Sequence, residues 1–267
     1  MKYRIGTEII DIDFNCFKLP QIWTIYEELD TKSSREKSSI RIVKNLNYDN
    51  LYSNIDVVKL DSTYTTVLRF DNDFILLDNG WSKANILVSS SEASINTTLC
   101  LLFYSRFVQK KAIQLHCATI EDQGRGVLFL GPSGIGKTTQ AERWAEFRGA
   151  SIINGDVGFV QRTEREYIAW GTPWHGSSPY CLNASVPVKA LVVLKQAPEN
   201  RLRELTGFEK VTEVSGSVFY PTWLEDGMEL CTDTLNHLLT DLPVYRLDNR
   251  ADRESVEILA KELDRIT

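Results

Sequence analysis

Short apolar or alternating segments fill the first ninety residues, separated by residues that favour turns. Such segments are typical of strands, which we expect at residues 55–60, 64–70, 73–77 and 84–88. Asp71-Asn72-Asp73 and Asp78-Asn79-Gly80 stand between them, and residues of these types tolerate left-handed backbone. The pattern therefore predicts an antiparallel meander. Residues 31–41 are polar and are expected to form a loop.

The apolar period changes to that of a helix between residues 91 and 109, with Ser90 or Ser91 as candidate cap. From Ile113 onward, strand-like and helix-like stretches alternate, which predicts a sheet with helices packed on it. The strands are expected at residues 127–130, 151–153, 159–162, 167–170, 188–195 and 243–247, and the helices at 138–148, 224–239 and 253–266. We predict a mixed α/β chain with a β-rich region at 1–90 and a second domain at 91–267.

Composition narrows the class of protein. The 267 residues are 43% apolar and 25% charged, which is ordinary for a folded globular chain. A net charge of −6 favours neither nucleic acid nor an anionic membrane as partner. Five scattered cysteines without a C-x-x-C pair argue against a disulfide framework and against a zinc site. No secretory signal and no membrane span are evident, so we expect a cytoplasmic protein.

A phosphate-binding loop is the clearest motif. Residues 131–138 match G-x-x-x-x-G-K-[ST] between an apolar strand and a helical pattern, the context that the motif requires. Its backbone N–H groups and the helix N-terminus would cradle phosphates, Lys137 would reach the β and γ phosphates, and Thr138 would bind Mg²⁺. The nucleotide-binding residues expected here are Gly131, Ser133, Gly134, Ile135, Gly136, Lys137, Thr138 and Thr139.

A metal-binding carboxylate should follow on the next strand. Asp156 ends the apolar run Ile152-Ile153-Asn154-Gly155 and could hold Mg²⁺ directly or through water. The chain contains no N-K-x-D motif for guanine, so ATP is the expected nucleotide.

At this point the chain resembles the kinases related to HPr kinase/phosphorylase, which share a nucleotide-binding core with phosphoenolpyruvate carboxykinases. The resemblance spans about residues 91–266. It is carried by Leu115-His116-Cys117-Ala118, residues 131–139, Asn154-Gly155-Asp156, residues 171–176 and Pro187-Val188-Lys189-Ala190. The family includes small kinases encoded beside peptide-modification enzymes and others that act on protein or amino-acid serine.

The resemblance implies roles for three residues. His116 matches the histidine ahead of the loop, and Asp156 matches the second of two aspartates, of which one takes the proton from a serine hydroxyl. Gly155 stands where the first aspartate should be. Asp156 is thus either the base or a metal ligand only, in which case His116 or His175 would orient the acceptor.

Residues 171–179 are rich in turn formers and predict a loop that contains Trp174 and His175. The loop is either a wall of the acceptor pocket or a turn whose Trp174 packs into the core. The function expected is Mg²⁺- and ATP-dependent phosphate transfer to serine of a peptide, protein or amino acid. The alternative is an ATP-binding regulator without turnover, which Gly155 favours; carboxykinase chemistry fits poorly because the chain is short. The sequence is compatible with a homo-oligomer and with a monomer.

Overall fold

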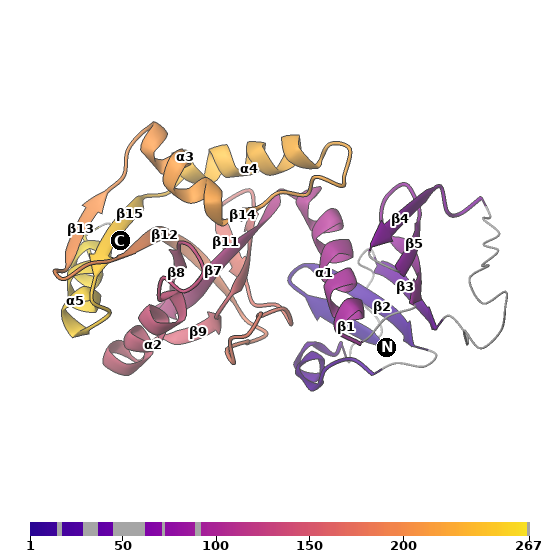
Figure 1. The fold of residues 1–267 in the computed structure, drawn as a ribbon, viewed down its shortest axis with the longest axis horizontal. Helices are drawn as coiled ribbons and strands as arrows, with labels where there is room; N and C mark the ends of the chain where they lie inside the picture. The colour runs from indigo at the N-terminus through magenta and orange to yellow at the C-terminus, as the bar shows by residue number, and fades with distance from the viewer. Residues whose placement is uncertain (15–17, 29–36, 45–61, 71–72, 89–91, 266–267) are drawn as a thin grey trace. The chain divides into compact units, whose positions relative to one another are not determined.

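The computed structural model describes residues 1–14, 18–28, 37–44, 62–70, 73–88 and 92–265 (Figure 1). They form two compact units, Met1–Arg106 and Phe107–Thr267. The division falls near the end of helix α1 (Glu92–Val108). The chain is a mixed α/β protein, and the domain boundary at residues 90 and 91 stays a prediction.

The first unit contains a six-stranded sheet in the order β1-β2-β3-β6-β5-β4. Its elements are β1 (Lys2–Ile5), β2 (Glu8–Phe14), the 3-10 helix η1 (Gln21–Tyr26), β3 (Lys37–Lys44), β4 (Thr66–Phe70), β5 (Asp73–Leu77), β6 (Lys83–Val88) and most of α1. Glu8 on β2 is buried, and its carboxylate pairs with Arg106 of α1 at 2.7 Å. Burial of this charge is thereby compensated within the unit.

The expected meander is confirmed only in part. Strands β4, β5 and β6 pair antiparallel, but β3 joins β2 and β6 in parallel. The prediction of a loop over residues 31–41 is wrong at its end, because β3 begins at Lys37. Ile40 and Ile42 of β3 are buried, while Ser39 and Arg41 are exposed, so the period-2 pattern was present but starts with polar residues. The strand expected at 55–60 lies outside the described residues.

The second unit is built on a nine-stranded sheet. Its strands are β7 (Ala112–Asp122), β8 (Arg125–Leu130), β9 (Ser151–Asn154), β10 (Val157–Arg162), β11 (Tyr167–Trp170), β12 (Ser185–Gln196), β13 (Arg201–Glu204), β14 (Val218–Phe219) and β15 (Val244–Asn249). Its helices are α2 (Lys137–Arg148), α3 (Phe208–Val214), the 3-10 helix η2 (Ser215–Ser217), α4 (Gly227–Asp241) and α5 (Arg253–Leu263). Each strand and helix expected in this half has a counterpart; β13, β14 and α3 were not foreseen.

Helices cover both faces of this sheet. Strands β8, β12 and β15 are adjacent and parallel, so their carboxyl ends lie at the same edge. Helices α2 and α5 pack on one face and α3 and α4 lie on the other (Figure 1). The core on the α2 and α5 side includes Phe129, Trp144, Val192 and Leu259, all fully buried. None of the helices in the described ranges is long and apolar enough to span a membrane.

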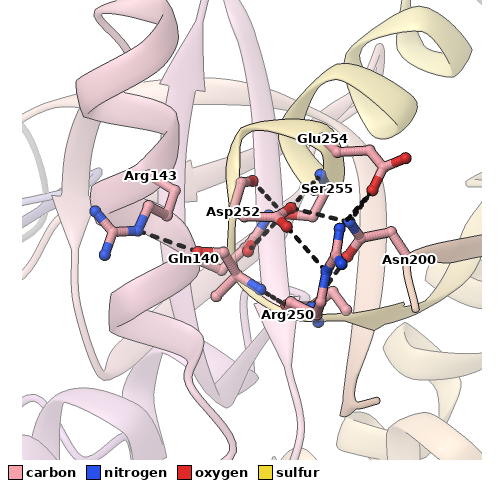
Figure 2. A network of polar contacts seen from close by, with 9 residues as sticks. Gln140, Arg143, Asn200, Arg250, Asp252, Glu254 and Ser255 are labelled. Carbon is pink, nitrogen blue, oxygen red and sulfur yellow. Dashed lines mark hydrogen bonds and ion pairs between the residues drawn. The ribbon is translucent and has the colours of Figure 1, made fainter. Parts of the chain in front are cut away.

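A polar network fixes α2 against the start of α5 (Figure 2). Fully buried Gln140 of α2 donates its amide to Ser255 Oγ at 3.3 Å. Asp252 caps α5 by accepting from the Ser255 N–H at 3.1 Å, and Arg143 donates to the carbonyl of Ala251 at 3.1 Å. Arg250 pairs with Asp252 and Glu254. The helix that follows the glycine-rich loop is therefore anchored to the start of α5 at Gln140 and Arg143.

Candidate functional site

The segment between β8 and α2 forms a glycine-rich turn at the carboxyl edge of the parallel strands. Gly131, Gly134 and Gly136 have φ of 137°, 77° and 107°. A Cβ added at Gly134 or Gly136 would meet nothing within 4 Å, so glycine is required there by the backbone conformation rather than by crowding. Gly136 caps α2, whose first residue is Lys137. The helix N-terminus and the turn are thus directed to one place, an arrangement suited to an anion.

The other residues of the motif differ in how far they are exposed to solvent. Lys137 is only 6% exposed, and its Nζ donates to the carbonyls of Gly131 and Pro132 at 3.1 and 3.3 Å. Burial lowers the pKa of Lys137, an effect that the nearby charge of Asp156 opposes. Ile135 packs on the core. Ser133, Thr139 and Gly134 are exposed.

His116 lies on β7 at the point where this strand changes partners. Before it, β7 pairs with β10 and β14, and from Cys117 onward it pairs with β8 and β9. His116 thus lies between the part of β7 that pairs with β14 and the part that pairs with β8. Its side chain is 27% exposed, and the aromatic ring of Phe219 on β14 lies beside it, with centroids 6.3 Å apart.

Asp156 lies in the turn between β9 and β10, directly opposite His116. The two side chains meet with His116 Nε2 3.0 Å from Asp156 Oδ1. The backbone holds this register, because the Cys117 N–H donates to the carbonyl of Asp156 at 3.0 Å. Thr138 Oγ1 donates to the carbonyl of Gly155 at 3.1 Å, which joins the same turn to the first turn of α2. The structure therefore brings His116, Asp156, Lys137 and Thr138 together.

The loop 171–179 packs directly on the turn that contains Asp156. A Cβ added at Gly176 would lie 1.8 Å from Asp156 Oδ2, and one added at Gly155 would lie 1.8 Å from Ser178 Oγ. His175 is half-buried, and its Nδ1 contacts the carbonyl of Ser178. Ser178 therefore occupies the space that a side chain would need at position 155, where the resemblance predicts an aspartate.

The side chains of Trp174 and of the third histidine, His237, do not face the turn that contains Asp156 in the contacts described for them. Trp174 is 5% exposed and packs against Phe159, with ring centroids 6.1 Å apart, so this side chain belongs to the core. His237 lies on α4 and contacts the carbonyl of Asp233 at 2.9 Å, one turn earlier on the same helix. Of the three histidines, His116 and His175 are the ones in the neighbourhood of Asp156.

Four residues at this site were not assigned a role from the sequence. Asn154 and Ser178 hold the turn and the loop, Phe219 lies beside His116, and Ser217 Oγ accepts from the Gly131 N–H at 3.3 Å. Asn before Gly-Asp is a turn signal that could have suggested a side-chain bond to the backbone at Asn154. The contacts of Ser217 and Phe219 depend on chain pairing across the sheet, for which the sequence carries no local signal.

Cys117 is a buried thiol next to the site. Burial raises its pKa to about 12, against smaller opposing effects from Thr119 and Lys137. A Cβ at Gly158 would meet its sulfur at 2.3 Å, so the thiol is tightly packed. Because a thiol must ionise to act as a nucleophile, Cys117 is a packing residue at neutral pH.

Comparisons with known proteins place the chain in a family. Over 106 residues it is 27% identical to the HPr kinase/phosphorylase of Mycoplasmopsis pulmonis (strain UAB CTIP), so it is a distant relative of these kinases. The match covers 40% of this chain and 31% of that protein, so it spans about a third of the relative's length. The family model described as "SynChlorMet cassette protein ScmC" matches residues 86–247, and the chain belongs to this family.

A solved structure of the Hpr(Ser) kinase/phosphatase from Coxiella burnetii is also similar. It is 12% identical, with a TM-score of 0.35, and the match covers 56% of this chain and 94% of that one.

Proposed function

We propose that this chain is a Mg²⁺- and ATP-dependent kinase that transfers phosphate to a hydroxyl, namely the serine of a peptide, a protein or a free amino acid. The observation that carries the proposal is the position of the His116 and Asp156 pair. These side chains are 3.0 Å apart and are joined to the glycine-rich turn through Thr138 and Gly155. The kinship with HPr kinase/phosphorylase and the cassette in the family's description agree with it.

The residues present fit a nucleoside triphosphate with its metal. Open space around Gly134 and Gly136 and the N-terminus of α2 suit the phosphates. Lys137 carries the positive charge, while Thr138 and Asp156 are oxygen ligands of the kind that Mg²⁺ takes from protein. When bound, ATP supplies the γ-phosphoryl group and Mg²⁺ neutralises its charge.

In this proposal Asp156 has two tasks, as a ligand of Mg²⁺ and as the base, and each histidine has one. Asp156 accepts the proton of the acceptor hydroxyl. The hydroxyl oxygen then forms a bond to the γ phosphorus of ATP, and the bond between this phosphorus and the leaving ADP breaks. His116 holds the Asp156 carboxylate in place, and His175 orients the acceptor from the neighbouring loop. Such a set of groups is sufficient because phosphoryl transfer depends more on position and charge than on a strong base.

An ATP-binding regulator is the second candidate, favoured by Gly155 in place of a carboxylate. The two candidates differ in turnover. We expect Mg²⁺ and ATP to bind with a calorimetric signal that Lys137→Ala abolishes, and ADP release to rise when free serine or serine-containing peptides are added. His237→Ala is the control and should behave as wild type. ATP binding without transfer to any of these hydroxyls would favour the regulator, and absence of ATP binding would exclude both.

A further inference from the structure

A fully buried asparagine joins the two parts of the candidate site. Asn154 Nδ2 donates to the carbonyls of Thr172 and Trp174 at 3.3 and 2.9 Å. Its Oδ1 accepts from the N–H groups of Asp156 and Val157 at 3.0 and 2.9 Å. We propose that Asn154 is a positioning residue that holds Asp156 and the acceptor loop, residues 171–182, as one body. This proposal rests on the proposed function, because it assigns the loop to the acceptor.

The geometry uses the whole hydrogen-bonding capacity of the amide. A primary amide offers two donors and two acceptor positions, and in Asn154 both donors face the loop while both acceptor positions face the turn. No other residue type of this size has both functions. The donors therefore fix the loop, the acceptors fix Asp156, and each half can be removed separately.

The loop is also tethered to the helix that starts at Lys137. Tyr180 OH donates to Glu142 on α2 at 3.0 Å, and Leu182 N–H donates to the carbonyl of Ile153 at 2.9 Å. Thr138 reaches the same turn through the carbonyl of Gly155. The turn and the loop are also joined by backbone bonds, including that from the Gly155 N–H to the carbonyl of Tyr180 at 3.2 Å, and Asn154 supplies the side-chain link between them.

The chain contains a matched control for this asparagine. Asn249 at the end of β15 is also buried, and its Nδ2 donates to the carbonyls of Lys195 and Leu247 at 3.3 and 3.2 Å. Its Oδ1 accepts from the Ala251 N–H at 2.8 Å. The local chemistry is nearly the same, but Asn249 does not contact the turn that contains Asp156. Substitutions at the two positions should lower the free energy of unfolding by similar amounts. Only those at Asn154 should change hydrogen exchange in residues 171–182 and phosphate transfer.

The experiment compares Asn154→Asp with Asn249→Asp. The carboxylate keeps the acceptor oxygens but loses both amide donors, so at position 154 it releases the loop and retains the turn. Hydrogen exchange of the amides in 171–182 should become about tenfold faster in Asn154→Asp, the effect of losing two net hydrogen bonds. It should be unchanged in Asn249→Asp. Melting curves of both variants measure the loss of stability that the two substitutions have in common.

The second readout is the separation of nucleotide binding from transfer. In Asn154→Asp the Kd for Mg²⁺ and ATP, measured by calorimetry, should stay within about threefold of wild type, while transfer to serine peptides falls about a hundredfold, as a misplacement of about 1 Å does. Should Asn154→Asp fail to fold, Asn154→Ser is compared with Asn249→Ser; serine removes the donors and the acceptor of the amide together, so the hydrogen-exchange arm of the test is kept. Exchange in 171–182 that is unchanged in the Asn154 variant, or equally raised in the Asn249 variant, would overturn the proposal. A wild-type protein without transfer would overturn the proposed function alone, because the exchange arm needs no acceptor.

Discussion

Two turns of the second unit are organised by a buried asparagine and have opposite surroundings. Around Asn249, the charged groups Arg250, Asp252 and Glu254 pair with one another, and Asn200 bridges them (Figure 2). Around Asn154, Gly155 and Gly176 pack closely against Ser178 and Asp156, and the Asp156 carboxylate lies 3.0 Å from His116. Paired charges stabilise a helix start, whereas the glycines around Asn154 allow the turn and the loop 171–179 to pack closely against each other. The difference distinguishes an anchoring turn from the turn that carries Asp156 in the proposed function.

The largest expected effect separates the two aspartates. Asp156→Asn should lower turnover about 10²- to 10⁴-fold, the usual contribution of a positioned base, and should weaken the response to Mg²⁺. Asp252→Asn should leave turnover unchanged, because asparagine caps a helix about as well as aspartate. ADP release at saturating ATP and acceptor is the measurement. Full turnover in Asp156→Asn would contradict the role proposed for Asp156.

The second prediction tests what each turn can accommodate. Gly155→Asp would create the aspartate pair that the resemblance implies, but its Cβ would lie 1.8 Å from Ser178 Oγ and 2.6 Å from Ser178 Cβ. We expect destabilisation of about 3 kcal/mol by overpacking and a melting temperature lower by about 6–12 °C. Ser178→Gly in the same chain should recover much of it. A Gly155→Asp protein with wild-type stability would show that the loop adapts freely.

A substitution in the anchoring turn around Asn249 is not expected to lower the free energy of unfolding, in contrast to Gly155→Asp. Ala251 has a φ of 54°, which costs a non-glycine residue about 1 kcal/mol. Ala251→Gly relieves this strain and loses part of the gain through the greater freedom of the unfolded chain. We therefore expect the free energy of unfolding to be unchanged or to rise by at most about 1 kcal/mol, measured by urea denaturation. A clear loss would mean that the Ala251 side chain contributes packing.

A third comparison uses the histidines. His175→Ala should lower kcat/KM for the acceptor about tenfold while the Kd for ATP stays constant, because the loop faces the acceptor in the proposed function. His237→Ala should change neither. A melting curve controls for loosening of the loop, since His175 also contacts Ser178. Equal acceptor kinetics in both variants would return His175 to a purely structural role.

The smallest effect concerns Arg250. Burial opposes ionisation of Asp252, but the Ser255 N–H, Asn200 and Arg250 hold the pKa of Asp252 below its ordinary value of 3.8. The stability from this group is complete above the ordinary pKa and is lost as the pH falls through the lower pKa of the folded state. Arg250→Ala should cost at most about 1 kcal/mol at neutral pH, because the side chain is half exposed. Arg250→Ala should also reduce the stability that is lost as the pH is lowered, which is measured by denaturation at several pH values.

Local patterns predicted the parts of the site that are contiguous in the chain. The order of strand, glycine-rich turn and helix around Lys137 follows from residue types within twenty positions, and so does Asp156 after an apolar strand. Helix α2 ends at Gly149, which has a φ of 72°, as a glycine after a helix does.

Other features depend on chain segments that meet only in the folded state. The contact of Gly155 with Ser178 arises because the chain leaves through β10 and β11 and returns. The parallel pairing of β3 was hidden because Lys37, Ser38 and Ser39 begin the strand with polar residues. Phe219 reaches His116 through pairing of a two-residue strand, which is too short to have a recognisable period.

The change of partners along β7 has a consequence for the order of folding. Gln114 and Leu115 obtain one of their strand neighbours from Phe219 and Val218, roughly a hundred residues later in the chain, and closing such a loop carries an entropic cost. Nearby partners such as β8 can join at once after a two-residue turn. Contacts of long sequence separation slow folding. The half of β7 that leads to His116 is therefore expected to gain its full set of partners late, after the nearby hairpin of β7 and β8 is formed.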